Sequence, residues 1–257
     1  MAGAQTHFIN GRSTLRVAVV TSMEERKRIA SELTEKLKVD ANVVAVALYP
    51  QVEPSPGEDA PALEMLVVVS RMPFDLDMLG MKKVIVSGSA IALFYVTPER
   101  LRAAIDDEAG CWFTSGRVLY SGTLYDQKGI LVGLRKAVNS VSRERRSATF
   151  ETWFEEAKAF PAIALQRGIT SMDTPDMILL RDDPALARAL FLLNSRPPRG
   201  PVLLMEDAMS LQKLPSGFQA ITDILKGLDR LNLKKFEKAR KAYSDLISDI
   251  RSLAKTL

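Results

Sequence analysis

Two short apolar runs separated by a proline-rich stretch constrain the fold of this chain more than any other feature. Val43–Leu48 contains only aliphatic residues, and Leu63–Val69 carries a single charge, at Glu64. Runs of this length and composition are typical of strands that are buried on both faces of a sheet. Residues 50–61 between them contain four prolines and one glycine, so they can form neither a helix nor a central strand. The pattern predicts two buried strands joined by a long loop.

Helical and strand patterns alternate through the rest of the first half. Ile29, Leu33 and Leu37 recur on one face, which predicts a helix over Ser22–Lys38. Pro98, preceded by Thr97 as a cap, is expected to open another helix. The remaining expected elements are a hairpin of Lys82–Val86 and Ala90–Val96 around Ser87-Gly88-Ser89, a short extended segment at Val118–Tyr120 and a helix at Gly129–Val141.

The second half of the chain is predicted to be helical. Its only strand candidate is Val202–Met205, and the helices are expected at Thr149–Gln166, Pro184–Leu193 and Phe218–Leu257. The polar and basic stretch 140–148, which includes Arg143, Arg145 and Arg146, is interpreted as a linker. We therefore predict the α+β class: a mixed sheet with flanking helices in a domain of residues 1–145, followed by an all-helical domain of residues 146–257.

Composition excludes several kinds of chemistry. Cys111 is the only cysteine and His7 the only histidine, which excludes an intrachain disulfide, cysteine-based zinc sites and histidine-dependent triads. Cys111 is expected to be a buried, inert thiol. No apolar run approaches the ~18–20 residues of a membrane span, so we expect a cytoplasmic protein without a membrane partner. Asn and Gln together number 11 beside 26% charged residues, which is compatible with a thermophilic source.

The two buried runs have further features that resemble a known superfamily. A strand and turn, VVAVALYPQ, are followed by a loop and a second strand, PALEMLVVVS, and then by the hairpin strand SAIALFYVTPE. This order resembles the polymerase-beta-like minimal fold of the nucleotidyltransferase superfamily. In that family a Gly-Ser turn precedes a strand with two alternating aspartates, and a later strand supplies a third carboxylate. Alternate strand residues point to one face, so such carboxylates can share two Mg²⁺ ions for phosphoryl transfer.

The residues at the corresponding positions depart from the family pattern. Pro50-Gln51 replaces the Gly-Ser turn, Ala62 and Glu64 replace the two aspartates, and Ala90 or Ala92 replaces the third carboxylate. Glu64 is therefore predicted to be a vestigial catalytic and metal-binding residue. The resemblance implies a degenerate nucleotidyltransferase with no cofactor, or with Mg²⁺ if activity remains. In that second case Glu53, Glu58 and Asp59 of the loop would assist Glu64.

The resemblance continues downstream. GRVLYSGTLYDQKGIL contains the phrase Leu124-Tyr125-Asp126 followed by Gly129, and ALFLLNSRPPRGPVLL and LPSGF resemble the C-terminal helical domain of some bacterial and archaeal members. In those members, the region of Arg196 and Arg199 approaches the nucleotide or the acceptor. The resemblance therefore suggests that Arg196 and Arg199 bind a nucleotide or phosphate, since paired guanidinium groups suit phosphate oxygens.

The last predicted helix has two faces. Its basic face is a candidate nucleic-acid or protein-binding surface, or alternatively a solvated face, and consists of Lys234, Lys235, Lys238, Arg240 and Lys241. Its apolar face has heptad spacing and consists of Phe236, Ala239, Tyr243, Leu246, Ile250, Leu253 and Leu257. This seam can pack within the chain or against a second subunit, so the protein is expected to be a monomer or a homodimer. The aromatic residues Trp112, Phe113, Trp153 and Phe154 are expected to be core residues.

Three functions remain open from the sequence. The first is a pseudoenzyme that binds a nucleotide, RNA or a protein partner. The second is a divergent active enzyme that transfers a nucleoside monophosphate from a nucleoside triphosphate. The third is an assembly protein that dimerises or docks through its last helix.

Overall fold

The computed structural model describes residues 8–9, 12–13, 22–50, 62–73, 80–86, 89–159, 184–201, 203–225 and 233–255. The chain divides into two compact units, Met1–Leu101 with Tyr120–Leu134 and Arg102–Leu119 with Arg135–Leu257. Arg102–Leu119 thus belongs to the second unit although it precedes part of the first, an interleaving that no sequence pattern predicted. The division into domains 1–145 and 146–257 stays a prediction.

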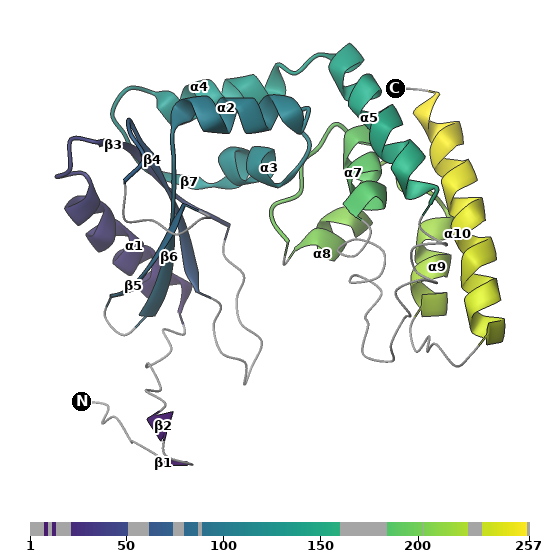
Figure 1. Cartoon of the computed structure of the whole chain (residues 1–257), viewed down its shortest axis with the longest axis horizontal. Helices are drawn as coiled ribbons and strands as arrows, with labels where there is room; N and C mark the ends of the chain where they lie inside the picture. The colour runs from purple at the N-terminus through teal and green to yellow at the C-terminus, as the bar shows by residue number, and fades with distance from the viewer. Residues whose placement is uncertain are drawn as a thin grey trace. The chain divides into compact units, whose positions relative to one another are not determined.

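The first unit contains a five-stranded mixed sheet (Figure 1). Its strands are β3 (Val43–Leu48), β4 (Leu63–Val69), β5 (Met81–Val86), β6 (Ser89–Val96) and β7 (Gly122–Asp126). Their order is β5-β6-β4-β3-β7; β4 and β6 run parallel, and the other neighbours run antiparallel. A separate antiparallel pair is formed by β1 (Phe8–Ile9) and β2 (Arg12–Ser13). The predicted strands Val43–Leu48 and Leu63–Val69 and the two strands of the predicted hairpin are confirmed, whereas β7 was not predicted.

Helix α1 (Met23–Leu37) covers one face of this sheet (Figure 1). Its N-terminus is capped by Ser22, whose hydroxyl accepts a hydrogen bond from the Glu25 backbone N–H at 3.1 Å. Ile29, Ala30 and Leu33 are buried in a core with alternate residues of β4 and β6. The apolar spacing seen in the sequence is therefore the surface by which α1 packs on the sheet.

Two further helices begin in the first unit. Helix α2 (Pro98–Asp107) starts with proline, and the Thr97 hydroxyl accepts from the Arg100 backbone N–H at 3.4 Å, as predicted. Helix α4 (Ile130–Asn139) is capped by Asp126, whose carboxylate accepts from the backbone N–H groups of Ile130 and Leu131 at 2.7 and 3.1 Å. A negative charge at this position also suits the helix dipole.

The second unit is helical throughout the part that the structure describes. Its elements are α3 (Phe113–Tyr120, of which Tyr120 belongs to the first unit), α5 (Arg143–Ala157), α7 (Pro184–Leu193), α8 (Leu204–Met209), α9 (Gly217–Leu225) and α10 (Leu233–Ala254). A single apolar core joins α5, α7, α8, α9 and α10. The α+β class predicted from the sequence, a mixed sheet with helices followed by further helices, is confirmed.

Several local predictions were wrong. Val118–Tyr120 is helical because Glu108 caps α3: its carboxylate accepts from the backbone N–H groups of Thr114 and Ser115 at 3.0 and 2.8 Å. The stretch interpreted as a linker contains the start of α5, which Ser142 caps at Arg145. The strand candidate at residues 202–205 overlaps α8 instead.

In place of the predicted last helix, the structure describes two helices, α9 and α10, and residues 226–232 lie outside the described residues. Residues 160–166, the end of the helix predicted to begin at Thr149, also lie outside the described residues. None of the helices in the described ranges is both long enough and apolar enough to cross a membrane.

Candidate functional site

The face of the sheet opposite α1 carries the positions at which the resemblance places metal-binding carboxylates. Leu63, Met65 and Val67 of β4 point into the core shared with α1, so Glu64 points to the opposite face. The parallel register pairs Glu64 of β4 with Ala92 of β6. Residues in register on neighbouring strands share a face, so Glu64 and Ala92 lie side by side.

The predicted turn lies beside the same end of β4. The backbone N–H of Tyr49, which follows β3, donates to the Glu64 carbonyl at 3.0 Å. Pro50 therefore lies next to the start of β4. Ala62 precedes Glu64 by two residues, and Ala90 precedes Ala92 by two residues. The topology thus brings together the residues that replace the family's turn and carboxylates. These residues are Pro50, Ala62, Glu64, Ala90 and Ala92.

This assembled face is mostly apolar. Glu64 is half-buried, Ala92 is buried, and Ala62 and Ala90 are exposed. The rings of Tyr49 and Phe94 contact each other on this face, with centroids 5.7 Å apart. Of the four positions that could hold the family's three carboxylates, the three alanine positions carry only methyl groups, which cannot coordinate a metal.

Lys83 of β5 introduces a positive charge on the same face. It is exposed and pairs in register with Ala92. Within the described residues, no group of three or more His, Cys, Asp or Glu could hold a metal ion. Glu53, Glu58 and Asp59 of the loop, like His7, lie outside the described residues. One carboxylate beside a lysine does not provide the ligands that a two-metal centre requires.

The structure places Arg199 in an ion pair rather than in an open turn. Its backbone N–H and its Nε donate to the two carboxylate oxygens of Asp207 at 2.6 and 2.7 Å, and its Nη2 donates to Glu206 at 2.7 Å. Asp207 is only 1% exposed. The hydrogen bonds that Arg199 donates to Glu206 and Asp207 raise its pKa. A phosphate at Arg199 would therefore have to compete with two carboxylates.

Arg196 has a different partner from Arg199. Its Nη1 donates to the Ser210 hydroxyl at 3.1 Å. Between the two arginines, Pro197 and Pro198 are buried. Pro198 approaches α3 so closely that a Cβ on Gly116 would lie 1.7 Å from the Pro198 carbonyl oxygen. This proline-containing segment therefore has a packing role in the second unit, and phosphate binding by its arginines stays a prediction.

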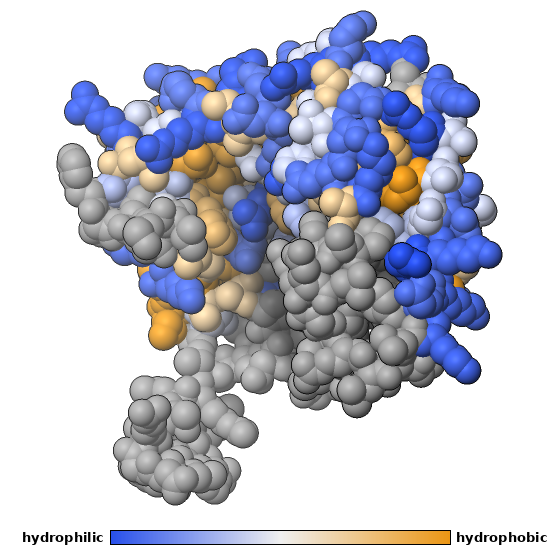
Figure 2. All heavy atoms as spheres, turned by 45° about the vertical axis from the view of Figure 1, so that its right-hand side comes forward, coloured by the Kyte–Doolittle hydropathy of each residue, from blue (hydrophilic) through white to orange (hydrophobic). Residues whose placement is uncertain are grey.

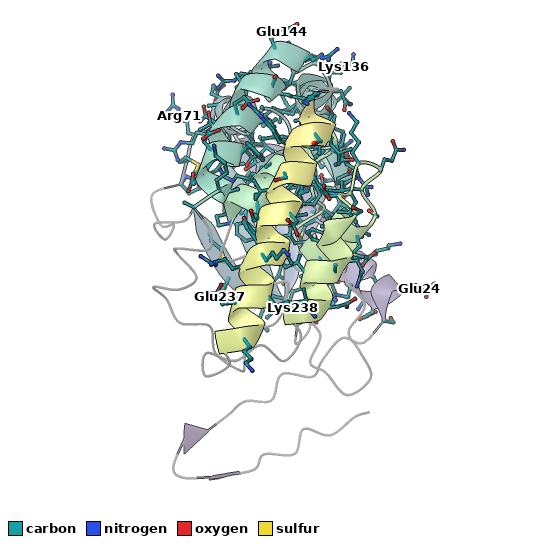
Figure 3. All side chains as sticks on the ribbon, turned by 90° about the vertical axis from the view of Figure 1, so that its right-hand side faces the viewer. Glu24, Arg71, Lys136, Glu144, Glu237 and Lys238 are labelled. Carbon is teal, nitrogen blue, oxygen red and sulfur yellow. The ribbon has the colours of Figure 1, made fainter. Side chains whose placement is uncertain are left out.

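The basic face of α10 is exposed, and the seam behind it is buried. Lys234, Lys238, Arg240 and Lys241 are exposed, and Arg240 pairs with Glu237 at 2.8 Å; the side chain of Lys235 lies outside the described residues. Figure 3 shows Lys238 and Glu237 on the N-terminal half of the helix. The first turn contains no acidic residue, so the lysines add to the positive end of the helix dipole.

The seam of α10 is used within the chain. Ala239, Tyr243, Leu246 and Ile250 belong to the core of the second unit, and the Tyr243 hydroxyl donates to the Ala157 carbonyl at 2.9 Å. Phe236 and Leu257 of the seam lie outside the residues whose side chains are described. On the face drawn in Figure 2, the described surface of the helical unit is mainly hydrophilic. The buried residues of the seam are therefore not available to a second subunit.

Arg188, the single charged residue of the apolar helix α7, was not among the functional residues predicted from the sequence. Its guanidinium carbon lies 3.9 Å from the ring centroid of Trp153 and 5.0 Å from that of Trp112. The prediction that the aromatic residues are core is confirmed: Trp112 and Phe154 are buried, and Phe113 and Trp153 pack against the core. A lone arginine in an otherwise apolar helix is the sequence signal that could have identified this arrangement.

Cys111 is buried in the second unit, as predicted. It is 1% exposed, and burial raises the pKa of its thiol to about 11. A neutral and inaccessible thiol is a poor nucleophile.

Comparisons with known proteins give little further information. No family model matches the chain, and no curated protein matches it. A similar solved structure is that of a nucleotidyltransferase-like protein from Exiguobacterium sibiricum, with 14% sequence identity and a TM-score of 0.44. The match covers 91% of this chain and 75% of that chain. At this TM-score the likeness establishes neither a family nor an activity.

Proposed function

We propose that this chain is a binding protein built on a nucleotidyltransferase-type sheet whose metal centre is degenerate. Its ligand is a nucleotide, RNA or a protein partner. One observation supports this proposal above the others. The register of β4 and β6 gathers Ala62, Glu64, Ala90 and Ala92 at one end of one face, where the resemblance requires carboxylates. Methyl groups keep the shape of the strands but provide no metal ligand.

The assembly alternative is less well supported. Dimerisation through the heptad face requires a free apolar surface, and the described core of that face is enclosed by the chain's own helices. The divergent-enzyme alternative rests on the retained Glu64 together with the loop carboxylates Glu53, Glu58 and Asp59. This alternative therefore predicts that nucleotide binding depends on Mg²⁺ and on Glu64.

The proposal is tested by titrating the protein with a fluorescent nucleoside triphosphate, with and without Mg²⁺. We expect any binding by the wild type to be independent of Mg²⁺ and unchanged in Glu64→Ala. Magnesium-dependent binding that is lost in Glu64→Ala would instead show an active metal centre, and the proposal would be abandoned.

A gain-of-function variant provides a positive control. Ala62→Asp and Ala90→Asp together place two carboxylates on exposed positions next to Glu64. We expect this double variant to acquire Mg²⁺ or Mn²⁺ binding in calorimetry, because three carboxylates then share one face. Failure of the double variant to bind either metal, despite correct folding, would count against this sheet face as the position of the lost centre.

A further inference from the structure

Arg188 occupies an unusual environment in the second unit. It is the only charged residue of α7, a helix in which eight residues are buried. Its guanidinium lies over the faces of both Trp112 and Trp153. A cation close to the faces of two indoles is attracted by both ring quadrupoles.

The guanidinium of Arg188 lacks hydrogen-bond partners among the described residues. Its Nε is buried and has none, and none of the hydrogen bonds within the described ranges involves its other nitrogens. Burial lowers the pKa of Arg188, which reflects the loss of hydration. An arginine offers five N–H donors, and leaving them without acceptors in a partly dry environment is unfavourable.

The nearby carboxylates do not pair with Arg188. Glu108 is occupied as the cap of α3, where it accepts from two backbone N–H groups and from the Ser115 hydroxyl at 2.9 Å. Glu156 interacts with Arg188 only at longer range, and its side chain is exposed to water, which screens its charge.

Arg251 provides a comparison within the same unit. Its guanidinium also lies over an aromatic ring, 5.3 Å from the centroid of Phe154. Unlike Arg188, it donates to both carboxylate oxygens of Glu151 at 2.6 Å. Stacking on an aromatic ring therefore does not by itself prevent an arginine from pairing with a carboxylate.

We propose that Arg188 is an anion-binding residue that recognises an oxyanion group, a phosphate or a carboxylate, of a small ligand. Both tryptophan rings lie against the guanidinium, so a ligand would bind the N–H groups that the rings leave uncovered. Two oxygens of one oxyanion match the parallel N–H groups at that edge. The indoles also exclude water, which strengthens a charge-assisted hydrogen bond. This site lies wholly within the second unit and does not depend on the proposed function of the sheet.

The chain is well suited to a direct test, because Trp112 and Trp153 are its only tryptophans. Tryptophan emission, excited selectively over that of the five tyrosines, therefore reports on this site. The protein is titrated with sodium phosphate and, separately, with sodium acetate, each against sodium chloride at equal ionic strength. We expect a saturable change in emission below ~10 mM of one of the two oxyanions. Saturation with phosphate identifies a phosphate ligand, and saturation with acetate identifies a carboxylate ligand.

Three variants make the test specific. Arg188→Met should weaken the binding at least about tenfold, and Arg188→Lys, which keeps the charge but lacks the planar fork, should weaken it by a smaller factor. Arg251→Met should leave the binding unchanged. Circular dichroism of each variant verifies that it is folded.

Three outcomes would overturn the proposal. One is the absence of a saturable response to either oxyanion in the folded wild type. Another is a response that persists in both Arg188 variants. The third is binding that appears only in Glu156→Gln, since this would show that Glu156 neutralises Arg188 in solution.

Discussion

The two units of this protein are stabilised in different ways. The sheet unit depends on alternation: one face of β4 and β6 packs on α1, and the described core there consists of aliphatic side chains. The helical unit depends on particular contacts. Examples are the approach of Gly116 to Pro198, the pair of Arg199 with buried Asp207, and the hydrogen bond from Tyr243 to Ala157. Single substitutions at such contacts should therefore affect the helical unit most.

The largest expected effect is that of Gly116→Ala. The new Cβ would lie 1.7 Å from the Pro198 carbonyl oxygen, and backbone on both sides has to move. We expect a loss of about 3 kcal/mol or more in the free energy of unfolding, measured by chemical denaturation.

Gly133→Ala is the matched control in the sheet unit. Gly133 is also helical, in α4, but nothing lies within 4 Å of its added Cβ. Alanine should therefore stabilise α4 by about 0.5–1 kcal/mol. If Gly116→Ala and Gly133→Ala changed the free energy of unfolding equally, the helical unit would not be more sensitive than the sheet unit to single substitutions.

The next largest effect concerns the two carboxylates that bind Arg199. Asp207 is 1% exposed, whereas the Glu206 side chain is 67% exposed. Asp207→Ala should cost about 2–3 kcal/mol, because it leaves a half-buried guanidinium and a backbone N–H without their acceptor. Glu206→Ala should cost less than about 1 kcal/mol, since an exposed ion pair contributes little. Thermal unfolding of both variants measures the difference.

Alkaline pH should destabilise the helical unit through Cys111. Its pKa is about 11 in the folded protein against a usual value of 9.0, so burial favours the neutral thiol. This contribution is complete below pH ~9 and is lost as the pH rises through ~11, because the unfolded chain releases its thiol proton first. The wild type should lose about 2 kcal/mol more than Cys111→Ala over this range. If the free energies of unfolding of the two proteins fell equally as the pH rose from ~9 to ~11, the raised pKa of Cys111 would be contradicted.

The smallest expected effect on stability is that of the lysines on α10. Lys234→Ala, Lys238→Ala and Lys241→Ala together should change the free energy of unfolding by no more than ~0.5 kcal/mol per site, because these side chains are exposed. If this face binds RNA, the triple variant should weaken that binding and reduce its salt dependence by about 0.7 per lost phosphate contact. Filter binding at several salt concentrations measures both quantities. An unchanged affinity would indicate a solvated face.

Prediction from the sequence succeeded where a pattern is local. The β-branched runs became β3 and β4, Thr97-Pro98 opened α2, and Pro184–Leu193 is a helix with the predicted limits. It failed where a distant residue decides. The segment ending in Val118–Tyr120 is helical because Glu108 caps it, and Gly122–Asp126 is a strand because it pairs with the edge of β3. Neither partner can be recognised from a short window of sequence.

The amino-acid sequence by itself determined the α+β class and the elements whose pattern is local, and its single cysteine excludes an intrachain disulfide. Periodicity and capping depend on neighbouring residues, so they can be read along the chain. Only the tertiary structure decided that Glu64 lies beside Ala92, that Arg199 is bound by Asp207, and that Arg188 lies over the rings of two tryptophans. These contacts depend on strand register and helix packing, which local patterns do not specify.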